Sequence, residues 1–546
     1  MFKKLLFYFS IPIALIAQPS KPIEYKGYIY KYSIEDLLKK QTPIQVKNAE
    51  KALEELESTN AIGKYKADFE SLDKHKLPEW FADAKFGMFY DWGMWSLAGY
   101  DDKGWTRAKY PDTYLGFMYN KSKKYHAKYW GSDFHRDDFI GLFSGKKFDA
   151  NQITDLALAG GMKYVVPFSK HMDGYCHFYS PFTHRNSVIM YPNRDFTKEL
   201  FDACKAKNLK YGGYFCNEEF EYPITDKSFK KLIMRNETAA NVPGFDGMQS
   251  DEKFRAFNSA IDNKLVSGKI PVPSYVNHYF VPLLKDFVDR YDPDILWYDA
   301  EWGRTPEYFR TKDISAYMYN KAEGRKEVVI NDRYGKGSRQ IHGDYNTSEF
   351  DEGEKTLDRV WEECRPVGES YGYTWQDNDS TVLTSTELVQ LLVRIVAKNG
   401  NLLLMVCPDG EGNIPDYQTK RIKDMGDWLK INGEAIYNTR PYKHAICDDL
   451  NTGQKVWYTQ SKDGKWGYAI FFEWPRAGET VLLRNAKPIW EKNIYLLGYD
   501  KPLSPNGDWV DTGEKLWGLT VKLPEEWKNP AKRAGQHAWV IKFETK

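Results

Sequence analysis

Short apolar runs alternate with segments of helical periodicity through most of the chain, from about residue 85 to residue 440. The strand-like runs cover residues 86–90, 164–168, 211–216, 295–298, 328–331 and 402–406; the main helical segments cover residues 151–159, 196–206, 275–291, 386–398 and 418–430. Repeated strand-then-helix order over this length predicts an α/β fold, a closed (β/α)8-like TIM barrel. An open doubly wound sheet is the alternative, but no Gly-x-Gly-x-x-Gly motif follows any predicted strand.

Two of the helical segments carry additional local signals. The segment 275–291 places four apolar side chains on one stripe, which suits a face laid against a sheet: Val276, Phe280, Leu283 and Phe287. Thr384 and Glu387 have the spacing of a capping box ahead of the segment 386–398.

The pattern changes at both ends of the predicted barrel, which we place at residues 78–440. After residue 440, the runs 456–460 and 466–472 flank a Lys-Asp-Gly turn, and residues 539–543 alternate apolar with polar. Residues 441–546 are therefore predicted to form an antiparallel β-sandwich. Residues 19–77 are polar and rich in Lys and Glu, which predicts a mostly helical N-terminal extension.

Residues 1–18 have the layout of a signal peptide, a short basic start followed by an apolar run too short to span a bilayer. We therefore expect an exported protein, periplasmic or secreted. The six cysteines contain no Cys-x-x-Cys pair and form no recognisable disulfide framework.

The charge balance, 77 Lys and Arg against 76 Asp and Glu, leaves a net charge of only +1, which argues against a nucleic-acid partner held by general electrostatics. A mean hydropathy of −0.64 argues against several membrane spans. The 86 aromatic residues (18 Trp, 38 Tyr and 30 Phe) suit both a large core and stacking against sugar rings. The oligomeric state does not follow from these numbers.

In a parallel barrel the catalytic groups gather at the carboxyl ends of the strands. The polar residues found there are Asp91, His171, residues 217–219, Asp299 with Glu301, and Asp332 with Arg333. Asp299 is the strongest candidate, because burial of a carboxylate directly after an apolar strand costs free energy and therefore indicates a functional role. A structural aspartate that caps the next helix is the alternative.

Hydrolysis of a glycoside needs a second carboxyl group to protonate the leaving oxygen. The downstream candidates are Glu349, Asp351, Glu352, Glu354, Glu362 and Glu363, and sequence spacing does not choose among them. Three histidines lie near Cys176, namely His171, His177 and His184, but their intervals match no familiar zinc pattern. We therefore expect no metal and no cofactor.

Several segments together resemble the α-L-fucosidases of glycoside hydrolase family 29. These are residues 80–89 (WFADAKFGMF), 163–166 (KYVV), 170–174 (KHMDG), 291–299 (YDPDILWYD), 331–333 (NDR) and 428–437 (WLKINGEAIY). The likeness runs in order from about residue 79 to residue 440.

The resemblance implies a retaining double displacement with Asp299 as the nucleophile and Glu349 as the acid/base, Glu362 being the second choice. A leaving-group acid must hold its proton, so we expect Glu349 near apolar or acidic neighbours. The resemblance also implies sugar contacts at Asp91, Trp92, His171, Met172, Tyr214, Trp297 and Arg333.

The chain departs from the family in its sugar contacts. Asp91 stands where the family usually has a histidine before Trp-Gly, and Met172 stands where it has the second of two histidines. The family's Glu-Trp pair has no convincing counterpart near residues 117–120. The catalytic groups of the family are thus present, whereas the residues that would contact the sugar hydroxyls differ.

Three functions follow from these observations. The first is an exo-acting retaining α-L-fucosidase that removes terminal α-L-fucosyl residues from an oligosaccharide or polysaccharide. The second is an α-L-galactosidase, or a related α-L-glycosidase, acting on algal or host polysaccharide. The third is a non-catalytic carbohydrate-binding protein that has kept the fold.

Overall fold

The computed structural model describes residues 30–32, 36–100, 110–117, 122–220, 222, 267–353, 356–448, 453–475, 480–484, 486, 488–489, 492–503, 508–511 and 517–545. The predicted signal peptide, residues 1–18, lies outside the described residues.

Eight parallel strands form the central sheet, in the order β5-β4-β3-β2-β1-β8-β7-β6. They are β1 (Phe86–Tyr90), β2 (Tyr164–Lys170), β3 (Lys210–Cys216), β4 (Ile295–Asp299), β5 (Val329–Ile330), β6 (Asn346–Glu349), β7 (Trp361–Pro366) and β8 (Gly400–Val406). A parallel bridge from Asn331 to Tyr345 links the two ends of this order. The predicted TIM-like barrel is thus confirmed.

Continuous burial explains the apolar strands. Every residue of β1, β2 and β8 is buried, because helices cover the sheet outside and side chains fill it inside. The prediction missed β6 and β7, since their sequences (NTSE and WEECRP) carry polar and charged side chains into the barrel. Strand β6 is also only four residues long, too short for a period to show.

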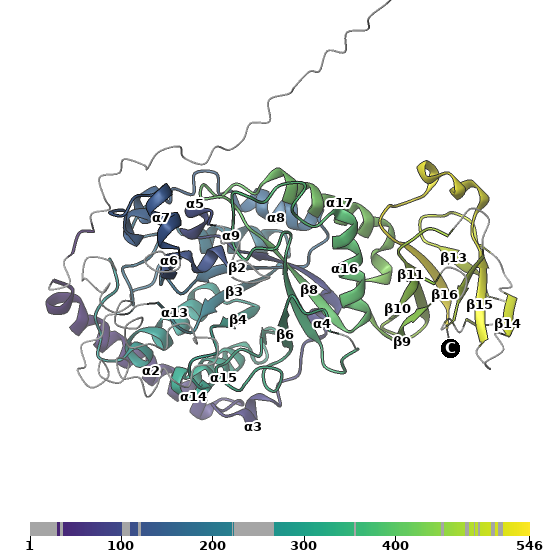
Figure 1. The fold of residues 1–546 in the computed structure, drawn as a ribbon. Helices are drawn as coiled ribbons and strands as arrows, with labels where there is room; N and C mark the ends of the chain where they lie inside the picture. Colours follow the sequence, from purple (N-terminus) through teal and green to yellow (C-terminus); the bar gives the residue numbers. More distant parts are fainter. Residues whose placement is uncertain are drawn as a thin grey trace, which may run out of the picture.

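Helices surround the barrel (Figure 1). They are α8 (Ala150–Ala159), α9 (Phe196–Ala206), α13 (Val281–Tyr291), α15 (Thr311–Ala322), α16 (Ser385–Ala397) and α17 (Asp416–Asn432). A π-helical turn, η4 (Val276–Phe280), precedes α13. The four stripe residues of 275–291 are buried, and the capping box at Thr384 and Glu387 is present, as predicted. Helix α15 was not predicted.

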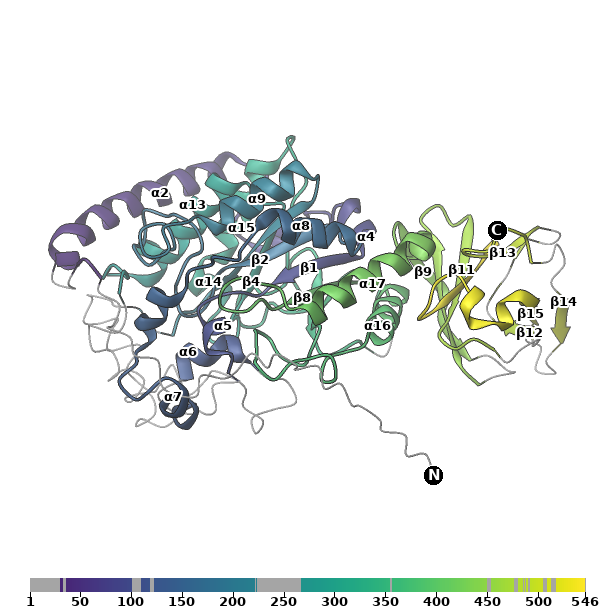
Figure 2. The ribbon, with the colours of Figure 1, turned by 90° about the horizontal axis from the view of Figure 1, so that it is seen from above.

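The N-terminal extension contributes one long helix to the outside of the barrel. A π-helical turn, η1 (Leu37–Gln41), continues into α2 (Thr42–Ile62), which lies along α13 and α15 (Figure 2). Short helices α3 (Phe69–Leu72) and α4 (Glu79–Ala84) lead from there to β1. None of the helices described is long and apolar enough to cross a bilayer.

The C-terminal part contains the predicted antiparallel sandwich. One sheet has the order β13-β16-β11-β10-β9 and the other β12-β15-β14. Their bounds are β9 (Thr439–Asp448), β10 (Lys455–Ser461), β11 (Trp466–Phe471), β12 (Thr480–Leu483), β13 (Ile494–Leu496), β14 (Asp508–Asp511), β15 (Trp517–Lys522) and β16 (Trp539–Glu544). Gly464, at φ +71°, completes the β10–β11 hairpin turn.

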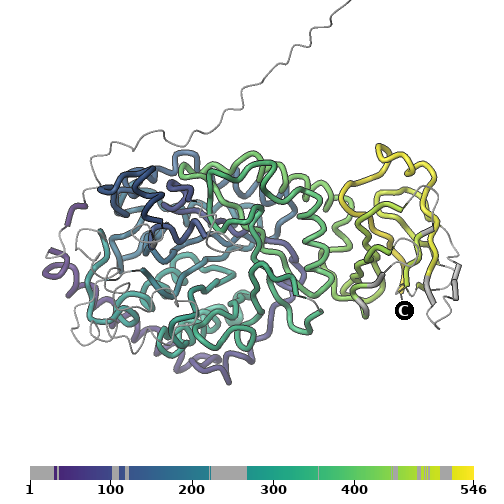
Figure 3. The backbone as a smooth tube through the Cα atoms, viewed as in Figure 1, coloured from purple at the N-terminus to yellow at the C-terminus, as the bar shows by residue number. Residues whose placement is uncertain are grey.

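The barrel and the sandwich meet through α16 and α17 (Figure 3). Helix α16 packs against β9 and β10, and the buried core of the barrel extends into the sandwich as far as Trp457 and Val540. A second core, around Leu519 and Phe543, lies within the sandwich. The two parts therefore abut through packed side chains.

Candidate active site

Asp299 is the last residue of β4 and lies at the carboxyl end of the barrel. Tyr214, on the neighbouring strand β3, donates its hydroxyl to Asp299 Oδ2 at 2.5 Å, and Arg333 Nη1 donates to Oδ1 at 2.7 Å. The following residue, Ala300, has φ +59°, an uncommon conformation for a residue with a side chain. Both carboxylate oxygens of Asp299 are thus held in place.

These contacts keep Asp299 ionised. Burial alone would raise the pKa of Asp299, but the Arg333 guanidinium and the hydrogen bonds from Tyr214 and from the Ala300 backbone bring it below its ordinary value. A carboxyl group must be ionised to act as a nucleophile. Asp299 meets this requirement, because its neighbours stabilise the negative charge and no proton has to neutralise it.

Glu349 ends β6 and shares the arginine with Asp299. Its Oε1 lies 2.5 Å from Arg333 Nη2, so one guanidinium bridges the two carboxylates. The Arg333 side chain is 1% exposed, whereas that of Glu349 is 27% exposed. Glu349 therefore lies at the open side of the site. Acidic groups lie near enough to Glu349 to interact with it electrostatically, namely Asp112 and Glu363, and the Glu349 carboxylate is also paired with the Arg333 cation.

Glu362 lies inside the barrel, away from solvent. It is fully buried, accepts from the Trp297 indole at 2.9 Å, and accepts from the Tyr164 hydroxyl at 2.6 Å. Burial raises the pKa of Glu362 to about 7, against the opposing effect of these hydrogen bonds. Trp297 in turn carries Arg333 over its ring face, with Cζ 4.6 Å from the centroid. Glu362 thus supports the residues that touch Asp299.

Asp91 directly follows β1 and His171 directly follows β2, and both are buried. Trp95 donates its indole N–H to Asp91 Oδ1 at 2.9 Å, while Asp91 Oδ2 has no hydrogen-bond partner among the described residues. The His171 ring stacks on Phe168 and lies tilted against Trp95, and burial lowers the pKa of His171 to about 3. A neutral imidazole beside an unpartnered carboxyl oxygen provides polar groups for sugar hydroxyls.

Asp112 is a member of this cluster that the sequence did not indicate. Its Oδ2 lies 3.6 Å from His171 Nε2, and its Oδ1 is buried and has no hydrogen-bond partner in the part of the chain that the structure describes. Burial, together with the charges of Asp91 and Asp299, raises the pKa of Asp112 well above its ordinary value. Asp112 lies in a short 3-10 helix, η2 (Pro111–Thr113), which is too short to show a periodic pattern in the sequence, so an alignment of relatives would have been needed to find it.

Two of the predicted sugar contacts, Trp92 and Met172, are buried among apolar side chains. Trp92 donates to the Asp409 carbonyl at 2.8 Å, and its ring packs among Phe143, Phe148 and Phe196, so its contacts are with the aromatic core rather than with Asp299. Met172 is buried in the core cluster that also contains Tyr214 and Trp297, and its carbonyl accepts from the Phe220 amide. Trp95, not Trp92, is the indole beside His171.

Several of the remaining candidate carboxylates have structural partners, whereas Glu354 lies outside the described residues. Glu352 pairs with Arg394, Glu363 accepts from the Ser348 hydroxyl, and Glu219 is paired with Lys170 and Lys269. Asp332 accepts from Thr347, which in turn accepts from Arg333 Nε at 2.9 Å. Within the described part of the chain, no three His, Cys, Asp or Glu side chains are grouped as a metal ion would require.

Comparison with known proteins places this geometry in a family. The alpha-L-fucosidase family model matches residues 52–434, and the model of the alpha-L-fucosidase C-terminal domain matches residues 448–544. Plasma alpha-L-fucosidase of Rattus norvegicus is 33% identical over 469 residues, covering 84% of this chain and 90% of the relative. Tissue alpha-L-fucosidase of Bos taurus is 31% identical over 491 residues, covering 88% and 91%.

Solved structures agree with these matches. The alpha-fucosidase of Thermotoga maritima in complex with a mechanism-based inhibitor has a TM-score of 0.69 and 27% identity, covering 88% of this chain and all of that one. The same enzyme in complex with fucose has a TM-score of 0.67 and 26% identity, with the same coverage. The matches span both the barrel and the sandwich, and the chain accordingly belongs to the alpha-L-fucosidase family of glycoside hydrolases.

Proposed function

We propose that the protein is an exo-acting retaining α-L-fucosidase that releases terminal α-L-fucosyl residues from glycans. The observation that carries the proposal is the bridging of Asp299 and Glu349 by the single guanidinium of Arg333. Retaining glycosidases hold their two carboxyl groups about 5–5.5 Å apart, and two carboxylates on one arginine are compatible with such closeness.

In the first step, Asp299 attacks the anomeric carbon while the bond to the leaving oxygen breaks. The proton of Glu349 passes to that oxygen, and a glycosyl ester of Asp299 remains. In the second step, Glu349 takes a proton from water, the water oxygen bonds to the anomeric carbon, and the ester breaks. Glu349 is thereby protonated again and Asp299 is freed as a carboxylate.

Arg333 has a distinct task at each stage. Before the first step, when Glu349 carries its proton, Arg333 pairs with the Asp299 carboxylate; in the ester intermediate, when Asp299 carries no charge and Glu349 is ionised, Arg333 pairs with Glu349. Its ring-face contact with Trp297 and its bond to Thr347 fix the guanidinium, which reduces the reorganisation needed during the reaction.

The sugar itself is tested by hydrolysis of aryl α-L-fucoside and aryl α-L-galactoside side by side. We expect the fucoside to be cleaved, with release of the α-anomer, which proton NMR detects before mutarotation. Preferred cleavage of the galactoside would favour the α-L-galactosidase alternative, for which Asp91 and Met172 are the motivating differences. Binding of a sugar without release from either substrate would favour the non-catalytic alternative.

Export belongs to the proposal as well. It is supported by the signal-peptide layout of residues 1–18 in the sequence. Expression of the full chain followed by mass spectrometry of the extracytoplasmic fraction would test it. A mature N-terminus near residue 18 supports export, and an intact N-terminus in the cytoplasm contradicts it.

A further inference from the structure

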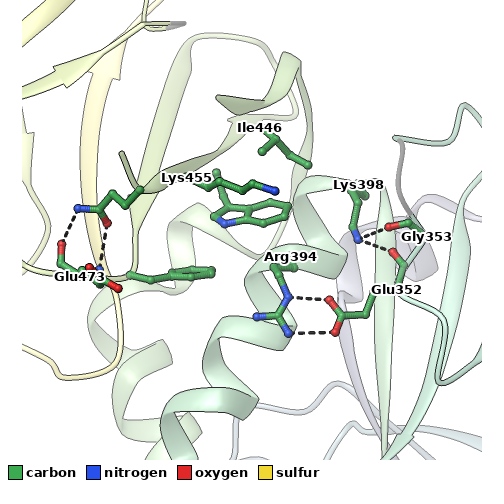
Figure 4. A pocket seen from close by; sticks show the side chains of 10 residues that line it. Glu352, Gly353, Arg394, Lys398, Ile446, Lys455 and Glu473 are labelled. Carbon is green, nitrogen blue, oxygen red and sulfur yellow. Dashed lines mark hydrogen bonds and ion pairs between the residues drawn. The ribbon is translucent and has the colours of Figure 1, made fainter. Parts of the chain in front are cut away.

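The segment that follows Glu349 is fastened to the C-terminal end of α16. Three residues after Glu349, the Glu352 carboxylate receives two bonds from Arg394, at 2.6 Å from Nε and 3.0 Å from Nη2 (Figure 4). Such a bidentate pair defines orientation as well as distance. The Arg394 guanidinium also keeps the pKa of Glu352 below its ordinary value, against the effect of burial.

Helix α16 holds the same segment at further points. Lys398 Nζ donates to the carbonyls of Glu352 and Gly353, the latter at 2.8 Å. Asn399 Nδ2 donates to the carbonyl of Leu357 at 3.0 Å. The connection from β6 to β7 is therefore held on both sides of residues 354–355 by one helix end.

The inner side of the segment faces the active site. Phe350, directly after Glu349, has φ +53° and lies edge-on to Tyr371, with the Arg365 guanidinium 4.3 Å from its ring centroid. Glu349 thus lies where strand β6 ends and this turn begins. Any displacement of Glu352 is transmitted through only two residues to the Glu349 carboxyl.

The Arg394–Glu352 ion pair and the Lys398 hydrogen bonds lie in a cleft between the barrel and the sandwich. Its volume is about 790 Å³, and its walls include Glu352, Arg394 and Lys398 from the barrel with Trp457 and Phe472 from the sandwich. Arg394 and Glu352 are 27% and 32% exposed. At such exposure an ion pair adds little to the free energy of unfolding, roughly 0–1 kcal/mol, so stability alone does not account for so specific an arrangement.

We propose that Arg394 is a positioning residue for the acid/base Glu349, acting by holding Glu352 against α16. The inference rests on the role proposed for Glu349 above. Arg394 touches neither substrate nor Asp299 in this scheme; it limits the places that the Glu349 carboxyl can occupy. The step most sensitive to that placement is proton transfer to the leaving oxygen.

The test compares Arg394→Met with wild type on two α-L-fucosides, a 4-nitrophenyl glycoside and a disaccharide with a poor leaving group. We expect kcat for the disaccharide to fall about tenfold with KM within twofold, and kcat for the activated glycoside to change less than twofold. Arg394→Lys, which keeps the charge and loses the bidentate geometry, should give an intermediate fall. If Arg394→Met does not fold, the comparison of Arg394→Lys with wild type on the two substrates tests the proposal.

The matched control is Arg325→Met, which removes another bidentate arginine–carboxylate pair. Arg325 binds Asp292 at 2.5 and 2.6 Å, at the end of β4 opposite to Asp299. Arg325→Met should shift Tm by an amount similar to that of Arg394→Met. Any change that it causes in kcat should be the same for both substrates. Equal losses on both substrates, or no loss on the disaccharide, would overturn the proposal for Arg394.

Glu349→Gln, measured in parallel, distinguishes failure of the positioning role of Arg394 from failure of the acid/base role of Glu349. If Glu349→Gln shows strong leaving-group dependence and the Arg394 variants show none, only the positioning role fails. If Glu349→Gln itself shows none, the proposed role of Glu349 fails and the inference about Arg394 fails with it.

Discussion

The indole N–H of Trp297 donates to Glu362 over 2.9 Å inside the barrel, and this contact joins a buried acid to the floor of the active site. Trp297 carries Arg333 on its ring, and Arg333 holds Asp299. Glu362 is therefore placed to support the catalytic groups from below, while solvent reaches Glu349 instead.

Glu362 should make stability depend on pH. Its pKa is raised from 4.5 to about 7 in the folded state, so between these values the folded chain keeps a proton that the unfolded chain has lost. The contribution of Glu362 to the free energy of unfolding is then fully present below about pH 4.5 and lost as the pH rises through 7, by about 3 kcal/mol in total.

The measurement is urea unfolding of wild type and Glu362→Gln from pH 4 to pH 8. Other buried carboxyls titrate in both proteins, so the difference between the two curves isolates this residue. We expect wild type to lose stability relative to the variant with rising pH. A difference that is constant over this range would show that Glu362 does not titrate as described.

Asp299→Ala should abolish turnover while leaving the fold intact. The variant loses the nucleophile, so kcat should fall by several orders of magnitude, and Arg333 keeps Glu349 as a partner, which limits the loss of stability. Asp292→Asn is the control, because it removes an arginine-paired carboxylate at the other end of β4. Near-normal rates in Asp299→Ala would refute the assignment.

Glu349→Gln and Glu362→Gln should differ in how their loss of activity depends on the leaving group. Loss of Glu349 should be severe with poor leaving groups and mild with activated aryl glycosides, because only the former need a proton. Loss of Glu362 should affect both substrates alike, through Trp297. Steady-state kinetics on a series of leaving groups measures this, and the opposite assignment of the two patterns would make Glu362 the acid/base.

Asp91 should tolerate asparagine and not alanine. Burial raises the pKa of Asp91, so its neutral carboxyl is favoured, and an asparagine oxygen can still accept from Trp95 at the same place. Alanine leaves the Trp95 indole unpaired, at a cost of about 1–3 kcal/mol. We expect Asp91→Asn to keep kcat/KM within about tenfold; equal damage from both variants would contradict this account.

The strands of the barrel could be predicted where burial on both faces demands apolar residues, as in β1 and β8. The same logic located Asp299, since an acid that directly follows such a run stands out. It failed at β6 and β7, because strands that carry Glu349 and Glu362 toward the interior have no apolar pattern.

The amino-acid sequence by itself determined the class of fold, the change to a sandwich after residue 440 and the strand ends where chemistry could lie, because burial and periodicity are local properties of the chain. Only the tertiary structure decided which side chains meet. Arg333 joins Asp299 to Glu349, Asp112 approaches His171, and Trp92 turns into the aromatic core. These contacts depend on loop paths and side-chain directions, which distant parts of the chain impose on one another.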